Sequence, residues 1–151
     1  MPKITEADYQ PLKAFFAAWW ERFPCPIPLS PENHPLAVME LIEKKSMSKA
    51  RLGLGMAIND TLEMSWDLRP AEVTALDRDF SERGIITLSE LRRRYSRHFR
   101  GVLKRGKIRD ETEYYLVAGI IASFTADVTE DELTKLSAMV GAYEDQVAKK
   151  K

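Results

Sequence analysis

Apolar side chains recur every three or four residues along most of this chain, which is the spacing of an amphipathic helix. The first such stretch covers residues 8–23, with Asp8 as its expected cap and Pro11 in its first turn. Five prolines between residues 24 and 35 exclude a helix interior or a central strand, so an extended connector is expected there. The apolar face of the first helix consists of Leu12, Phe15, Phe16, Trp19 and Phe23.

Two further helices are predicted between the connector and residue 65. The first covers residues 35–45 and has Asn33 as its expected cap, and the second begins at Ser48. Gly53 and Ala57 lie on one face of the second helix, where small side chains would let another helix approach closely. A phosphate-cradling loop at these glycines is the alternative, but no strand precedes them and the lysine and hydroxyl of a P-loop are absent.

The second half of the chain has clear helix-start signals. Pro70 suits the first turn of a helix that Gly84 would end. Three later helices each begin with a capping residue followed three positions on by a glutamate, which is the capping-box pattern. These pairs are Thr87 with Glu90, Asp110 with Glu113, and Thr129 with Glu132.

The predicted fold class is all-α, a single compact bundle of about six to seven helices with a proline-rich extended connector after the first helix. One domain is expected over residues 1–151, divided into an aromatic helix (1–23), the connector (24–35) and a helical core (36–148). No apolar run approaches the roughly 18 residues that cross a bilayer, so no membrane association is expected. The single cysteine, Cys25, excludes an intramolecular disulfide and favours a cytoplasmic location.

The residues that carry enzyme chemistry form no recognisable pattern in this sequence. His34 and His98 are the two histidines, and neither is placed in a catalytic triad. No catalytic residue, cofactor loop or metal-ligand set is identified, so we expect neither an enzyme nor a cofactor. A catalytic site assembled only in space is the alternative to this interpretation.

Positive charge is concentrated in one segment. Residues 92–109 contain nine basic residues and no acidic one, whereas the rest of the chain has 14 basic and 23 acidic residues. If residues 87–105 form one helix with its apolar side chains inward, a cationic stripe follows the outer face. Like charges at this spacing repel, so acidic groups or phosphates are expected to neutralise them. The stripe consists of Arg93, Arg97, Arg100 and Lys104, flanked by Arg94 and Arg105.

Two kinds of group can neutralise these cations. One is the chain's own acidic residues, among them Asp77, Asp79, Glu82 and Glu111. The other is an external partner, either nucleic-acid phosphate, which arginine binds bidentately, or an acidic protein surface. Residues 70–83 followed by a glycine turn and a second helix resemble half of a helix-turn-helix, although a pI of about 6.8 is low for a nucleic-acid binder.

These patterns favour a non-enzymatic binding or regulatory protein that contacts nucleic-acid phosphates through residues 92–109. The alternative is a protein-interaction module, such as an adaptor, an inhibitor or an antitoxin-like regulator. Its basic helix would then pair with an acidic partner or with the chain's own acidic surface. Trp20 and Trp66 are the candidate interface residues of that alternative. The sequence does not distinguish DNA from RNA and does not indicate an oligomeric state.

Overall fold

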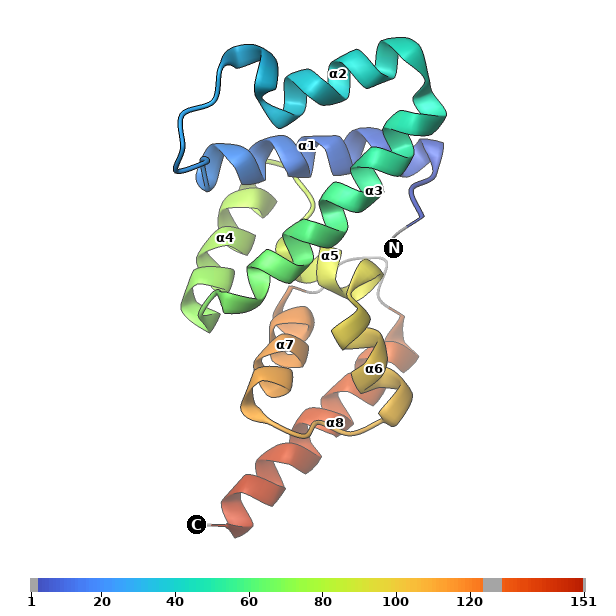
Figure 1. Ribbon diagram of the computed structural model, residues 1–151. Helices are drawn as coiled ribbons and strands as arrows, with labels where there is room; N and C mark the ends of the chain where they lie inside the picture. The colour runs from blue at the N-terminus through green and yellow to red at the C-terminus, as the bar shows by residue number, and fades with distance from the viewer. Residues whose placement is uncertain (1–2, 124–128, 151) are drawn as a thin grey trace. The chain divides into compact units, whose positions relative to one another are not determined.

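The computed structural model describes residues 3–123 and 129–150, and these residues contain α-helices and short 3-10 helices but no strand (Figure 1). The all-α prediction is confirmed. Eight α-helices are present in the described ranges, against the predicted six to seven, because one expected helix is divided in two. They are α1 (Glu6–Arg22), α2 (Pro35–Lys45), α3 (Met47–Met64), α4 (Pro70–Glu82), α5 (Leu88–Tyr95), α6 (Arg97–Arg105), α7 (Glu111–Ala122) and α8 (Glu130–Lys149).

The chain divides into two compact units. One comprises Met1–Asp67 with Phe80–Ile86, and the other Leu68–Asp79 with Thr87–Lys151. The prediction of one domain and a single bundle over residues 1–151 stays a prediction, and positions 1–2, 124–128 and 151 of that domain lie outside the described residues.

The first unit is built on the apolar face that the sequence predicts for α1. In this unit α3 packs against both α1 and α2, and α2 lies alongside α1 (Figure 1). The hydroxyl of Tyr9 on α1 donates to Glu43 on α2 over 2.6 Å, and Lys13 forms an ion pair with the same carboxylate over 2.6 Å. The buried side chains include Leu12, Phe15, Phe16 and Trp19 from α1, and Ala50, Leu54, Ile58 and Leu62 from α3.

The cap predicted for α1 is wrong, because the helix begins one turn earlier than expected. Thr5 has an extended backbone, and its side chain accepts a hydrogen bond from the Asp8 amide over 3.2 Å. Pro11 therefore lies in the second turn and removes the bond that its amide would have donated to the Ala7 carbonyl. Both Ala7 and Pro11 are exposed, so water can satisfy that carbonyl. The earlier start also adds Tyr9 to the buried face.

The caps predicted for α2 and α3 are also displaced, by one and two residues. Asn33 belongs to a short 3-10 helix (Pro31–Asn33) inside the proline-rich connector, and His34 caps α2 by accepting from the Leu36 amide. Ser46, in place of Ser48, caps α3 by accepting from the Lys49 amide. In both cases the true cap is the residue with extended backbone angles, a property that residue type alone does not fix.

The second unit is organised around α7, which packs against α5, α6 and α8. All three predicted helix starts are confirmed at their N-cap residues. The side chains of Thr87, Asp110 and Thr129 each accept from the amide three residues on. The C-terminal part of α8 extends beyond α7 (Figure 1). Buried apolar residues of this unit include Leu88, Leu91, Phe99, Val102, Ile108, Leu116, Val117, Ile120 and Leu136.

The expected single helix over residues 87–105 is wrong. The amide of Ser96 donates to the Arg92 carbonyl and closes α5, while the Ser96 side chain accepts from the Phe99 amide and caps α6. Ser96 is buried and has extended backbone angles. A serine that can satisfy helix amides with its own oxygen favours a cap over a helix interior, which explains the break. The four cations of the predicted stripe therefore lie on two helices.

Two glycines give a matched test of backbone conformation. Gly84 ends α4 with φ of 71°, in the left-handed region that favours glycine, whereas Gly53 lies inside α3. A Cβ atom at Gly53 would have no neighbour within 4 Å, so the predicted close approach of another helix at Gly53 is wrong. We expect Gly84→Ala to lower the free energy of unfolding by about 1–2 kcal/mol and Gly53→Ala to raise it by about 0.5–1 kcal/mol. Urea denaturation of the two variants measures both changes, and equal effects would contradict this interpretation.

Among the described residues, no helix combines the length and the apolar character needed to span a membrane.

Candidate functional site

The N-terminal half of the basic segment is neutralised within the second unit. Glu90, on α5, is only 4% exposed and accepts from two neighbouring arginines. Arg93 Nη2 lies 2.5 Å from Glu90 Oε1, and Arg94 Nε lies 3.0 Å from the same oxygen. Arg93 also pairs with Glu132 of α8 over 3.4 Å. Hydrogen bonding to Glu90 raises the pKa of Arg93 above its usual value.

A second set of polar contacts joins α4 to α5. The half-buried carboxylate of Asp77 accepts hydrogen bonds from the Ser89 amide, over 3.2 Å, and from the Ser89 hydroxyl. Burial raises the pKa of Asp77, against the opposing effect of the Ser89 hydrogen bonds and the positive charge of Arg92. Burial also lowers the pKa of Arg92, which is 8% exposed. Asp77, Glu90 and Glu132 therefore lie beside Arg92, Arg93 and Arg94 and reduce the charge available to a partner.

At the other end of the basic segment, Glu113 holds two arginines. Arg105 Nη2 donates to both Glu113 oxygens over 2.8 Å, and the Arg109 amide donates to Oε1 over 2.8 Å. The guanidinium of Arg109 makes only a 3.5 Å contact with Glu113, and its side chain is 66% exposed. This arrangement depends on Gly106, whose φ of 74° ends α6 and turns the chain back toward α7.

Three cations on α6 face outward between these two neutralised groups. Arg97, Arg100 and Lys104 are exposed, while Phe99 and Val102 of the same helix are buried. Their intervals of three and four residues place the three cations on one helix face. Within residues 3–123 and 129–150, no carboxylate forms an ion pair with any of them, although Arg100 Nη2 donates to the Arg94 carbonyl over 3.3 Å. We call Arg97, Arg100 and Lys104 the outer cations.

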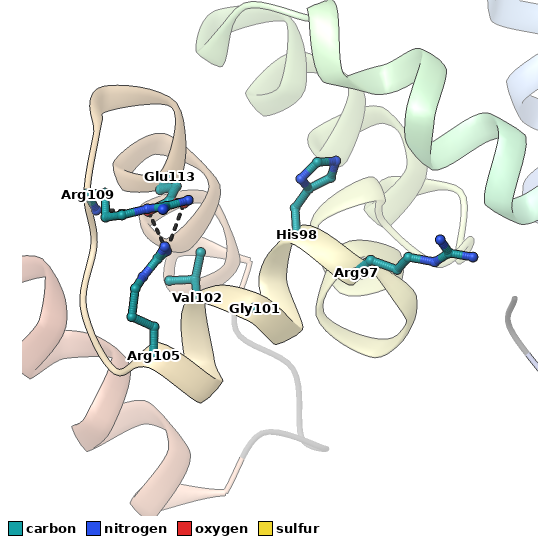
Figure 2. A pocket seen from close by; sticks show the side chains of 7 residues that line it. All are labelled: Arg97, His98, Gly101, Val102, Arg105, Arg109 and Glu113. Atoms are coloured by element: carbon teal, nitrogen blue, oxygen red, sulfur yellow. Dashed lines mark hydrogen bonds and ion pairs between the residues drawn. The ribbon is translucent and has the colours of Figure 1, made fainter.

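A hollow of about 250 Å³ adjoins the outer cations, between α6, the 106–110 turn and the start of α7. Figure 2 shows Arg105 and Arg109 meeting at Glu113, while Arg97 points away from them at the other end of α6. His98, Gly101 and Val102 complete the lining of this space. Three arginines and one glutamate line the space, and the Arg97 guanidinium is directed away from the other three charged groups (Figure 2). We call this space the α6 hollow.

The structure thus separates the six cations of the predicted contact surface. Arg93, Arg94 and Arg105 are engaged by Glu90, Glu132 and Glu113, whereas Arg97, Arg100 and Lys104 form the outer cations. Sequence reasoning did not find the α6 hollow, and it included Arg109 only as the end of the basic segment and not among the six contact residues. It identified Glu113 only as a capping-box residue. The sequence signal that could have indicated the pairing of Glu113 with arginine is the cluster of basic residues around Gly106, at positions 104–109.

The two tryptophans proposed for a protein interface lie in the first unit, and both are half-buried. The Trp20 ring packs edge-on against Phe16 and His34, at centroid distances of 6.2 and 5.9 Å. Its indole nitrogen is buried and has no hydrogen-bond partner among the described residues. A role for Trp20 or Trp66 in binding stays a prediction.

No group of three or more potential metal ligands is brought together in the part of the chain that the structure describes. Comparisons with protein-family models, with curated protein sequences and with solved structures find no match for this chain.

Proposed function

We propose that this chain is a non-enzymatic cytoplasmic binding or regulatory protein that contacts nucleic-acid phosphates through α6. The contact surface is narrower than the segment 92–109, because carboxylates of the second unit already pair with the arginines of α5. It comprises the outer cations together with the rim of the α6 hollow. Arginine and lysine at such positions bind phosphate oxygens without reading sequence.

The observation that carries this proposal is the outward face of α6. Three cations lie on one side of a nine-residue helix with buried apolar residues opposite, and no carboxylate of the described residues pairs with them. A protein that needed positive charge only for stability would be expected to place acidic partners here, as it does at Glu90 and Glu113. Exposed like charges are favoured when a polyanion neutralises them.

A protein partner is the second candidate, and apolar side chains on the first unit favour it. Val38 and Leu41 on α2 and Leu52 and Met56 on α3 are between 41% and 61% exposed. Exposed apolar side chains in such number on two packed helices are typical of an interaction surface. An adaptor, an inhibitor or an antitoxin-like regulator would use such a surface, with or without the basic helix.

The salt dependence of binding tests the first proposal. We expect the purified chain to bind mixed-sequence DNA or RNA at about 50 mM salt and to lose affinity steeply by about 200 mM, because each phosphate contact releases counterions. Three to five contacts predict a slope of about −2.7 to −4.5 for duplex DNA, and of about −2 to −3.5 for a single strand, in a plot of log affinity against log salt concentration. Fluorescence anisotropy with labelled oligonucleotides measures this slope. Absence of binding at low salt would exclude the proposal and favour the protein partner.

A further inference from the structure

The α6 hollow contains arginines in two different states. Arg105 is held by two hydrogen bonds of 2.8 Å to the Glu113 carboxylate. Arg109 is anchored by its backbone amide, but its guanidinium makes only the 3.5 Å contact with Glu113. Because that contact is weak and the side chain is largely exposed, the Arg109 guanidinium can turn toward a ligand at little cost. The hollow thus has one fixed arginine and one arginine able to close on an anion.

The charge of the hollow favours one class of anion. Arg105 and Arg109 meet at Glu113, which neutralises one of their two charges, and Arg97, which points away from them, adds a positive charge at the edge of the space (Figure 2). A phosphate monoester carries about −1.5 to −2 at pH 7, whereas an internal phosphate diester of a nucleic acid carries one negative charge. A cationic space attracts the more highly charged monoester more strongly, and arginine guanidinium groups bind its oxygens bidentately.

The size of the hollow is also suited to a phosphate monoester. Its volume of about 250 Å³ lies below the 300–1,000 Å³ typical of pockets for drug-sized ligands. A phosphate group with the first atoms of its attached sugar is small enough for such a space.

We propose that the α6 hollow binds a phosphate monoester. On a nucleic acid this group is the phosphate at a chain end, and in that form the inference rests on the proposed function. The outer cations would then bind the diesters that follow, since they adjoin the hollow on the same helix. The chain would prefer phosphorylated ends to the interior of a strand.

The test uses one single-stranded oligonucleotide in three forms, with a 5′-phosphate, with a 3′-phosphate and with neither. We expect one phosphorylated form to bind the full chain at least about tenfold more tightly than the unphosphorylated form, from one added charge-assisted contact. Arg109→Gln, which removes the guanidinium able to turn toward a bound phosphate, should reduce this advantage toward one. Arg100→Gln removes the same charge from α6 outside the hollow and should weaken all three forms equally. Circular dichroism establishes that each variant is folded.

The outcomes separate the two proposals. Equal affinity for all three oligonucleotides would overturn the monoester site while the nucleic-acid proposal stands. Binding of none of them would overturn the nucleic-acid proposal, and titration with a nucleoside 5′-monophosphate, with the unphosphorylated nucleoside as control, would then decide the hollow by itself. Saturable binding of the monophosphate that Arg109→Gln abolishes would support a site for free phosphate monoesters, and absence of binding would overturn it.

Discussion

Replacing Glu90 by glutamine is expected to lower the free energy of unfolding by about 3–5 kcal/mol, the range found when one member of a buried ion pair is removed. Glu90 is 4% exposed and accepts from Arg93 and Arg94, whose side chains are 13% and 29% exposed. Glutamine preserves the shape of the side chain but leaves these two guanidinium groups without the carboxylate between them. Glu132 compensates little, because it contacts Arg93 alone and at 3.4 Å. Urea denaturation of the full chain measures the loss.

Glu72→Gln is the matched control for this prediction. Glu72 also pairs with an arginine three residues away in the second unit, Arg69, but the side chains of that pair are 42% and 83% exposed. Exposed pairs contribute little to stability, so the midpoint of unfolding should hardly move. Similar losses of unfolding free energy in the two variants would mean that burial does not determine the contribution of Glu90 to stability. They would contradict the role of Glu90 as the buried carboxylate that neutralises the arginines of α5.

Reversing the three outer cations should have the largest effect on binding. The variant Arg97→Glu, Arg100→Glu, Lys104→Glu removes three phosphate contacts and adds three repulsive charges. We expect affinity for mixed-sequence nucleic acid at about 50 mM salt to fall at least about 100-fold. The salt slope should become shallower by about 3. Because all three side chains are exposed and form no ion pair within the described residues, the variant should fold normally by circular dichroism.

A second triple variant controls for total charge. Lys44, Lys45 and Lys49 are exposed in the first unit, and their replacement by glutamate changes the net charge by the same amount. If affinity depends on the α6 surface, this variant should bind nearly as well as the unchanged chain. Equal losses in the two triple variants would indicate a general charge effect and would remove the case for a defined surface on α6.

The second half of the fold was the more predictable half, for a local reason. A capping box satisfies backbone amides within four residues, so Thr87, Asp110 and Thr129 each determine a helix start without help from distant contacts. The caps of α1, α2 and α3 were missed because several polar residues compete near each start. Burial of Tyr9 and the backbone angles at His34 and Ser46 decide among them.

The candidate site was predictable in its location and not in its details. The run of nine basic residues identified the segment, but the spacing alone suggested one helix and one stripe. Ser96 is a single residue whose side chain competes for backbone amides, and its effect on a long amphipathic pattern is not visible in the periodicity. Likewise, the pairing of Arg105 with Glu113 requires the left-handed turn at Gly106, which brings two helices together.

The break at Ser96 also separates two properties that a continuous helix would have joined. On one rigid helix, any substitution that shifted the arginines paired with Glu90 and Glu132 would have moved the outward cations with them. With α5 and α6 as separate segments, the stabilising contacts of Glu90 and the exposed face of α6 belong to different helices. Substitutions at the exposed positions of α6 can therefore change the charge that it presents while the contacts of Glu90 in α5 are kept, so the nucleic-acid affinity proposed for α6 can evolve independently of the stability of α5.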